Sequence, residues 1–425
     1  MKNFFALWLL LVPSCVMAQS GTNSPYSQYG LGILNDQSTG FNRGMNGVAM
    51  GMHESNQVNF QNPASYANID SLTFIFDVGA AMQVTNYKEG DRKLNAYNAN
   101  FEYAVMAFRV LKNLGVSVGI MPFSNIGYNY YTTSEVSGSS STSYSTSYYG
   151  SGGTRVIYAG IGWKPVKPLS IGANIGYFWG SYSRSIVNSF SETNINTIGR
   201  YYTADMSSYT LDLGLQYTAS LGGKNSLTLG LKYSPGHSIG GSADLNEIST
   251  NSETSISDTT SYSHSRGLFI PTTYAAGLAW YYGKKWKVGA DYSYQKWGEK
   301  PFPDLEGSGY NMVDGILKDR HKFTLGGVYT HNPISRHYLS RVQVRAGVGY
   351  ATPYITVNGK DGPKELSASL GFGLPITNSF NNRSVFNISF QWMQYSADNL
   401  IRENMFRINI GLTFNENWFM KWKVQ

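Results

Sequence analysis

Apolar and polar residues alternate over long stretches of this chain, and the clearest stretch runs from Met405 to Phe414. Successive side chains of a β-strand point to opposite faces, so a segment of this kind presents one apolar and one polar face. The apolar positions, which share one parity, are Phe406, Ile408, Ile410, Leu412 and Phe414. The pattern predicts a β-strand.

The same alternation recurs from Leu72 onward and predicts fourteen strands. Nearly all reach the roughly 9–11 residues that a tilted strand needs to cross a membrane, although Leu227–Tyr233 has to borrow residues from its flanks. The predicted strands are Leu72–Val84, Asn98–Val110, Leu114–Tyr131, Arg155–Trp163, Leu169–Val187, Ser207–Thr218, Leu227–Tyr233, Leu268–Tyr282, Trp286–Trp297, Lys322–His331, Val342–Tyr350, Leu366–Leu374, Val385–Tyr395 and Met405–Phe414.

Short and long connections alternate between these strands. Leu111–Asn113 and Ser220–Asn225 are short, whereas 132–152 and 234–266 are long. Tight turns at one end and long loops at the other are typical of an outer-membrane barrel, whose turns face the periplasm. Because the strand number is even, both termini are expected to be periplasmic.

Two of the long loops have low-complexity sequences. Ser134–Gly153 consists mostly of Ser, Thr, Tyr and Gly, and Ser249–Ser265 mostly of Ser and Thr. Such segments bury too little apolar surface to offset the entropy of ordering, so they are expected to be exposed loops without regular structure. Tyrosine interspersed with serine can also form an adaptable contact surface.

Tryptophan positions support a membrane location. Trp163, Trp280 and Trp286 lie beside short turns, and Trp297 lies beside a long loop. Because indole favours the lipid–water boundary, these residues predict two aromatic girdles, one at each end of the barrel.

The composition agrees with a barrel in lipid. Of the 425 residues, 15% are aromatic and only 14% are charged, with 46 glycines and 32 tyrosines. Typical globular proteins have about a quarter charged residues. Beyond the first twenty residues, no apolar run approaches the roughly 18 residues of a spanning helix. The net charge of +7 is scattered, which favours solvated turns over a nucleic-acid partner.

The N-terminal residues predict export. Lys2, the apolar Phe4–Val12 and the small residues Val16-Met17-Ala18 form a signal peptide over 1–18. Cys15, the single cysteine, faintly resembles a lipoprotein signal, but the preceding Pro13 fits that signal poorly. Cleavage after Ala18 leaves a mature chain without cysteine.

Three further segments follow the signal peptide. Residues 19–70 lack strand or helix periodicity, and their glycines, methionines and aromatics favour packing inside the barrel over a solvated tail. The barrel itself spans 71–414, and 415–425 form a periplasmic tail. The fold class is therefore all-β, a fourteen-stranded antiparallel transmembrane barrel with an N-terminal plug.

Charged and acidic residues occur on the parity that faces the lumen. Charge there needs a partner or water, so both signs predict a polar network that either holds a plug or lines a conduit. These lumen-facing residues are Asp77, Glu102, Asp212, Asp291, Lys322 and Arg407.

The sequence offers no enzyme chemistry. The six histidines lack metal-ligand spacing, and no nucleophile pairs with a base at a strand end. The glycines at 150–153 do not precede a helix, which argues against a phosphate cradle. We therefore expect no enzyme, no cofactor and no metal site.

The segment before the first strand carries a recognisable motif. It combines a glycine-rich stretch with an Asn-Pro-Ala-Ser sequence, and its residues are Gly44, Gly47, Asn59, Asn62, Pro63 and Ala64. This segment resembles the entry segment of FadL-type outer-membrane transport barrels. The resemblance extends to the fourteen strands and to the Gly-Ser-Gly-Gly at 150–153 that opens a strand. It implies a hatch in the lumen and transport of small hydrophobic compounds such as long-chain fatty acids.

The third predicted strand carries a proline in its middle, followed by Phe123, Ser124 and Asn125. Proline cannot donate to a sheet ladder, so Pro122 predicts a bulge or break. In FadL-type barrels a kink in this strand opens a lateral gap, and the resemblance implies such a gap at Pro122–Asn125. The alternative is a tolerated bulge without an opening. Pro271 predicts a second break, without a family role.

Two functions therefore stay open. The first is inward passage of hydrophobic small molecules through the barrel, from which they leave for the outer-membrane lipid. The second is a non-conducting FadL-like barrel that serves as a subunit or anchor of an outer-membrane secretion or assembly complex with protein partners. The aromatic and basic tail, with Trp418, Phe419 and Trp422, slightly favours the second.

Overall fold

The computed structural model describes residues 21–136, 142–307, 309–376 and 384–416. The signal peptide and residues 417–425 of the tail lie outside this range. Within it, one antiparallel sheet of seventeen strands closes on itself because β2 pairs with both β3 and β23. Three of its strands, β1, β10 and β11, lie outside the closed ring, so fourteen form the barrel. The predicted fold class is confirmed.

Each predicted strand corresponds to one barrel strand, usually with longer bounds. The ring runs in chain order through β2 (Phe74–Glu89), β3 (Arg92–Leu111), β4 (Leu114–Glu135), β5 (Ser143–Val166), β6 (Leu169–Phe190), β7 (Thr197–Gly222), β8 (Asn225–Ser234), β13 (Thr273–Tyr282), β14 (Trp286–Gln295), β17 (Arg320–Thr330), β18 (Gln343–Ala351), β21 (Lys364–Pro375), β22 (Val385–Ser396) and β23 (Arg402–Glu416).

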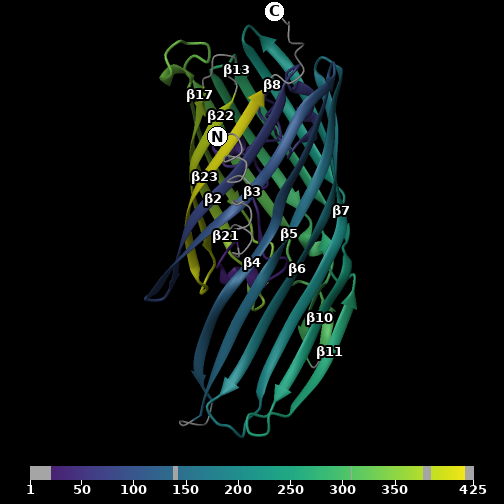
Figure 1. The fold of residues 1–425 in the computed structure, drawn as a ribbon, viewed down its shortest axis with the longest axis vertical. Helices are drawn as coiled ribbons and strands as arrows, with labels where there is room; N and C mark the ends of the chain where they lie inside the picture. The colour runs from purple at the N-terminus through teal and green to yellow at the C-terminus, as the bar shows by residue number, and fades with distance from the viewer. Residues whose placement is uncertain (1–20, 137–141, 308, 377–383, 417–425) are drawn as a thin grey trace, which may run out of the picture.

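The wall is taller on one side than on the other. Strands β4 to β7 have 22 to 26 residues, whereas β13 and β14 have ten. The hairpin of β10 (Gly240–Thr250) and β11 (Ser257–Ser265) continues the tall side, because β10 pairs with β7. These strands extend below the rest of the barrel in Figure 1.

Two low-complexity segments are therefore strands and not structureless loops. Within Ser134–Gly153, β4 and β5 pair from Glu135↔Ser143 onward, and within Ser249–Ser265, β11 pairs with β10 along its whole length. Serine, threonine and tyrosine here satisfy their backbone groups on neighbouring strands, so little apolar burial is required. The glycines at 150–153 lie inside β5 and do not open it.

Alternation places apolar side chains outside and polar ones inside. On β23, Phe406 is 60% exposed, whereas Arg407 is 7% exposed. The same parity runs around the ring, as expected for a wall that meets lipid on its outer face and protein or water on its inner face. The described helices are short, and none is long and apolar enough to cross a membrane.

The lumen is filled by residues 21–72, here called the lumenal segment. Its elements are η1 (Pro25–Gln28), β1 (Ile33–Leu34), α2 (Gly40–Arg43) and η2 (Pro63–Asn68). Most of its side chains are buried, with Met45, Val48 and Val58 fully so. Aromatic, methionine and glycine packing against the inner wall explains why the segment lacks a strand or helix period.

The two ends of the barrel sheet lie together, because Phe74 at the start of β2 pairs with Glu416 at the end of β23. This end carries the short turns. The first described residue, Gly21, lies away from this end, in the middle of the wall. A side chain added there would meet Asn125 of β4, well beyond the short turn at Asn113. The lumenal segment therefore starts in the wall and ends at the short-turn end.

Short elements fold over the long-loop end of the lumen. β9 (His237–Ser238) pairs with β12 (Phe269–Ile270), β15 (Phe302–Glu306) pairs with β16 (Gly309–Val313), and β19 (Thr356–Val357) pairs with β20 (Lys360–Asp361). The 3-10 turn η3 (Trp297–Glu299) follows β14 at the same end, whereas η4 (Leu339–Arg341) lies in the connection between β17 and β18 at the short-turn end.

The girdle assignment of Trp297 is wrong. Trp297 is 0% exposed, and its ring centroid lies 5.9 Å from that of Phe269 and 5.1 Å from that of Tyr354. The outward side chains of β14 are even-numbered, such as Trp286 and Tyr292, so Trp297 falls on the inward parity just beyond the end of the strand at Gln295. Trp163, Trp280 and Trp286 do lie on the outer face, each 38–48% exposed.

Candidate functional site

Ion pairs join the lumenal segment to the inner wall. The Arg43 Nη2 atom lies 2.6 Å from Glu102 Oε2 on β3, and both side chains are 2% exposed. Lys322 Nζ on β17 lies 3.3 Å from Asp36 Oδ1. Further along the segment, Glu54 pairs with Lys287 of β14 at 2.5 Å. These pairs contact β3 on one side of the ring and the neighbouring strands β14 and β17 on another, so they fix the segment across the lumen.

Hydrogen bonds to carboxylate and hydroxyl groups of the wall add to this network. Asp291 accepts hydrogen bonds from the backbone N–H groups of Ala49 (2.6 Å) and Met50 (2.9 Å). The Tyr103 hydroxyl donates to Asp77 at 2.9 Å and accepts from the Gly40 N–H at 2.7 Å. The acidic residues expected to face the lumen thus do so, and two of them, Glu102 and Asp291, bind the lumenal segment.

The asparagines of the sequence motif shape the segment itself. Asn62 caps η2 by accepting a hydrogen bond from the Ala64 N–H at 3.2 Å, with Pro63 in the first turn. Asn59 donates to the carbonyl oxygens of Ala49 (2.7 Å) and Met52 (2.9 Å). The motif therefore folds residues 49–64 into a compact unit.

The motif glycines allow close approach. The α-carbon of Gly44 lies against Gly371, where a side chain on either residue would collide with the other backbone or with Arg345. Gly47 has φ +87°, which favours glycine, and its N–H donates to the Asn42 carbonyl at 2.9 Å. Both positions follow α2 and turn the chain across the lumen.

Wall glycines form the matching surface, and they were not singled out from the sequence. A Cβ atom at Gly230 would lie 1.9 Å from the Met50 carbonyl oxygen, and one at Gly115 would lie 2.1 Å from that of Tyr66. A Cβ atom at Gly172 would lie 2.4 Å from the carbonyl carbon of Pro63. Glycines on the lumen-facing parity of several strands are the signal that could have predicted this docking surface.

Among the ionisable groups of the lumenal segment with shifted pKa values, Asp36 and His53 differ in role. Burial acts to raise the pKa of Asp36, but the adjacent Lys322 and Arg43 outweigh it and hold that pKa below its ordinary value of 3.8. Burial lowers the pKa of His53, which favours the neutral ring. Asp36 is thus a charged anchor, whereas His53 packs as an aromatic group on Tyr281 at 4.9 Å.

The wall is interrupted between β3 and β4. Their ladder runs only from Leu111↔Leu114 to Ala104↔Ile120, and a bulge in β4 follows between Pro122 and Ser124. Above this point the two strands have no ladder with each other. The break predicted at Pro122 is present in the strand, with Phe123 as the extra residue, which packs edge-on against Phe178 at 5.3 Å.

The first part of the lumenal segment fills this interruption. β1 pairs with β4 through Ile33↔Asn125 and Leu34↔Ser124, and the Asn35 N–H donates to the Phe123 carbonyl at 2.9 Å. On the β3 side, Asn100 donates to the Gly21 carbonyl at 2.8 Å. Because lipid offers no hydrogen bonds to a free strand edge, this segment supplies the partners that β3 does not.

A second interruption lies between β7 and β8. Their ladder ends at Leu213↔Tyr233, and the ladder of β7 with β10 begins only at Ser207↔Gly240. Residues 208–212 of β7 have no ladder partner on this side. The chain opposite turns inward at Pro235 and Pro271 to form the β9–β12 pair, so Pro271 does break the predicted eighth strand.

A cavity of about 100 Å³ lies inside this second interruption. Its apolar lining comes mainly from the lumenal segment, the inner faces of β4 and β5, and β12. Its polar lining comes from β7, β8 and β9, with further amide and hydroxyl groups from the lumenal segment, β6, β13 and β14. Lining residues include Phe60, Met121, Phe123, Tyr158, Asp212, Lys232 and His237.

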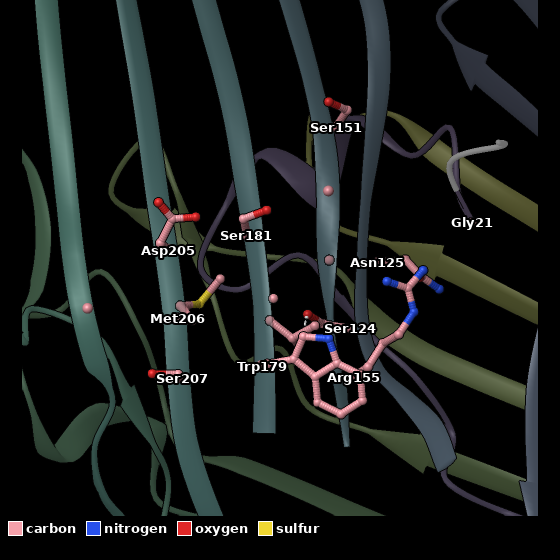
Figure 2. A pocket seen from close by; sticks show the side chains of 15 residues that line it. Gly21, Ser124, Asn125, Ser151, Arg155, Trp179, Ser181, Asp205, Met206 and Ser207 are labelled. Atoms are coloured by element: carbon pink, nitrogen blue, oxygen red, sulfur yellow. Dashed lines mark hydrogen bonds between the residues drawn. The ribbon is translucent and has the colours of Figure 1, made fainter. Parts of the chain in front are cut away.

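The outer face of the tall wall carries a polar groove, here called the outer-wall groove. Arg155 pairs with Trp179, and Ser181 pairs with Asp205, across β5, β6 and β7. Figure 2 shows Arg155 and Trp179 together at one end of the groove, and Ser181 and Asp205 further along it. Gly152 and Gly153, with φ +131° and +149°, bend β5 there.

The groove lies directly beyond a row of outward tyrosines. Tyr177 and Tyr209 pair with each other and are 54% and 53% exposed. Other exposed tyrosines at the long-loop ends of their strands are Tyr233, Tyr274, Tyr292 and Tyr350. Tyrosine therefore takes the place on the long-loop side that the sequence assigned to Trp297.

Metal chemistry has no evident place in the described part of the chain. No cluster of three or more His, Cys, Asp or Glu side chains there could hold a metal ion. The site thus consists of a filled lumen, two wall interruptions and a polar outer groove.

Solved structures share this architecture. A Pseudomonas aeruginosa FadL homologue aligns with a TM-score of 0.62 at 13% identity, over 91% of this chain and 99% of that one. The Pseudomonas putida toluene transporter TodX aligns at 0.60 and 14%, over 93% and 100%, and the Ralstonia pickettii toluene transporter TbuX at 0.59 and 13%, over 89% and 98%. A comparison with curated proteins gives no match.

The closed ring with its N-terminal segment in the lumen gives this chain the fold of the FadL-type class of barrels. Within that class, the family model described as BamG matches residues 1–425, and the chain belongs to the BamG family.

Proposed function

We propose that this protein is a closed outer-membrane barrel that acts as a structural subunit or anchor of an outer-membrane protein complex. The short-turn end of the barrel, with the end of β23, faces the periplasm in this proposal. The outer-wall groove is the contact face for the protein partner.

The filled lumen carries the proposal. Ion pairs and backbone hydrogen bonds tie the lumenal segment to at least four strands, and the β3–β4 interruption is occupied by the segment itself. The interior cavity of about 100 Å³ is far below the roughly 300–1,000 Å³ of sites that enclose drug-sized ligands. A long-chain fatty acid would therefore require the segment to leave its place.

The outer-wall groove supports a protein contact. A bare barrel in lipid presents apolar side chains, but here Arg155, Ser181 and Asp205 lie just beyond the tyrosine row on the tallest part of the wall. Polar groups of both signs in a concave surface suit a partner that brings complementary charge. Membership of the BamG family leaves such a role open.

Affinity purification from native outer membranes tests the proposal. A tagged chain should retain one protein partner in stoichiometric amount, and the charge reversal Asp205→Lys should reduce its yield severalfold. Lys93→Glu, a reversal of an exposed residue at the β2–β3 hairpin and outside the groove, serves as the control and should leave the yield unchanged. Recovery of the barrel alone from native membranes, or equal yields with both variants, would contradict the proposal.

A second candidate function is transport of small hydrophobic compounds such as long-chain fatty acids, with a lateral outlet at Pro122–Asn125. The interruption between β3 and β4 favours it, because the chain that fills it is held by few backbone ladder pairs. The similarity to toluene transporters of the same fold also favours it.

Ligand uptake separates the two candidates. Radiolabelled fatty acid or toluene should enter cells faster with the native protein than without it if the barrel transports. Joining the N-terminal segment to β4 with an engineered disulfide, as in Asn35→Cys with Asn125→Cys, should then abolish the gain. Uptake that is independent of the protein would remove this candidate and leave the first intact.

A further inference from the structure

We propose that the interruption between β7 and β8 is the mouth of a binding site for a small aromatic compound that carries one hydroxyl group, of the phenol class. The site is the cavity behind it, and the ligand enters sideways from the outer membrane. This proposal goes beyond a structural role, because it requires neither conduction nor a protein partner.

The wall is open here in a way that it is not at β3–β4. Residues 208–212 of β7 face the connection from β8 to β10, which departs inward at Pro235. Among the described residues, no strand of the lumenal segment pairs with β7 at this height. Proline at 235 and at 271 explains the departure, since neither residue can donate to the ladder.

The mouth lies at the level where an amphiphile concentrates. Tyr209, in the outward tyrosine row, stacks on His237 with ring centroids 4.1 Å apart and planes 7° apart. Aromatic residues with a polar tip favour the boundary between hydrocarbon and headgroups, and phenols partition to the same boundary. The ligand would therefore meet the mouth without crossing water.

The cavity behind the mouth suits one ring. Phe60, Met121, Phe123 and Tyr158 form its apolar side, and the Phe60 and Tyr158 centroids are 5.9 Å apart. Its volume of about 100 Å³ is close to the scale of an apolar cavity of about 150 Å³ that accepts benzene. A longer apolar chain would not fit.

The polar side of the cavity calls for a hydroxyl. His237 lines the cavity, its Nε2 atom lies 2.8 Å from the Ser208 hydroxyl, and its buried Nδ1 atom has no protein partner. Depending on which way the serine hydrogen bond runs, Nδ1 is either a donor or an acceptor. A hydroxyl group can satisfy both states, whereas a carbonyl or an ammonium group satisfies only one.

The neighbouring charges are already paired. Asp212 accepts from Lys232 at 3.1 Å and from Ser234 at 2.5 Å, so the pair adds polarity without a net charge. A ligand with a full charge would have to break this pair or remain without a counterion in a buried site. The site therefore selects a neutral ligand.

Binding of 4-fluorophenol, followed by fluorine NMR on the full-length mature protein in detergent micelles, tests the site. Saturable binding above the micelle background is expected for the native protein. His237→Phe retains the stacked ring but removes the nitrogen, so it should weaken binding about three- to tenfold, which corresponds to one hydrogen bond. Fluorobenzene, which lacks the hydroxyl, should bind equally to both proteins.

Two further variants keep the test decisive. Thr210→Phe places a ring at the mouth from the lumen-facing side of β7 and should abolish binding of both probes. Leu213→Ala, on the lipid-facing side of the same strand, controls for partition into detergent and should change nothing. Non-saturable binding to the native protein, equal loss of both probes with His237→Phe, or no effect of Thr210→Phe would each overturn the proposal. None of these results depends on the partner yield that tests the structural role.

Discussion

Arg43 in the lumenal segment and Glu102 on β3 form an ion pair of 2.6 Å in which both side chains are 2% exposed. Glu102 occupies a bulge in β3, because Gly79 pairs with Tyr103 and Ala80 pairs with Phe101. The bulge turns the carboxylate into the lumen at the height where α2 ends. A local irregularity of the wall thus provides the anchor for the segment that fills it.

Removing one partner of this pair should loosen the lumenal segment. Breaking a buried ion pair leaves an uncompensated charge and costs about 3–5 kcal/mol. Glu102→Ala is therefore expected to make residues 21–72 accessible to protease while the barrel strands stay protected. Limited proteolysis followed by mass spectrometry measures both regions in one experiment.

A surface pair gives the matched control. Arg200 and Glu247 lie 3.4 Å apart with both side chains 33% exposed, so their pairing contributes about 0–1 kcal/mol. Glu247→Ala should leave the proteolysis pattern as it is. If Glu102→Ala also leaves it unchanged, the anchoring role of the pair is refuted.

Acid should weaken the docking of the lumenal segment through Asp36. Because the folded pKa of Asp36 lies below 3.8, its charge stabilises the docked state fully above that pH, and the contribution is lost as pH falls through the folded value. Hydrogen exchange of residues 36–46 should therefore accelerate below about pH 3.8 more than exchange of the barrel strands. Asp36→Asn should exchange faster at neutral pH and lose this acid response; an unchanged response in that variant would assign it to another group.

A side chain at Gly230 should displace the segment without breaking the barrel. The added Cβ atom would lie 1.9 Å from the Met50 carbonyl, which cannot retreat while Asp291 holds the Met50 N–H. Gly230→Val is expected to raise bilayer conductance and to retain the heat-modified shift of a folded barrel on gels. Leu229→Ala, a change at the outward-facing neighbour, should leave the conductance unchanged. If Gly230→Val also leaves the conductance unchanged, the predicted displacement is contradicted.

The sequence predicted those parts of the fold that depend on alternation. Strands such as β23 meet lipid on one face and a polar lumen on the other. The alternation of an apolar residue, Phe406, with a charged one, Arg407, reflects this contrast and is visible in the sequence. The extensions of β5 and β11 were missed because serine-rich strands outside lipid need no such contrast. The path of residues 21–72 also could not be predicted from the sequence, because it depends on contacts with distant strands, such as that of Gly230 with Met50.

Trp297 should behave as a core residue despite its place beside a long loop. Trp297→Ala removes a fully buried ring that packs on Phe269 and Tyr354, at a cost of about 3–5 kcal/mol. We expect the thermal unfolding midpoint to fall clearly, whereas Trp280→Ala, on the lipid-facing wall, should shift it little. A midpoint that responds equally to both variants would argue against the buried position.

The first described residues of the chain bind some of the last ones. The Ser24 hydroxyl donates to Glu403 at 2.6 Å, and the Tyr26 hydroxyl donates to the carbonyl of Ile401. These contacts cannot form until the final strand has been synthesised, exported and closed against β2. The residues around Ser24 and Tyr26 therefore stay without these partners until β23 is in place. Contacts between residues so far apart in the sequence make folding slow. Until the barrel closes, the exported chain therefore depends on other proteins to keep its apolar strands from aggregating.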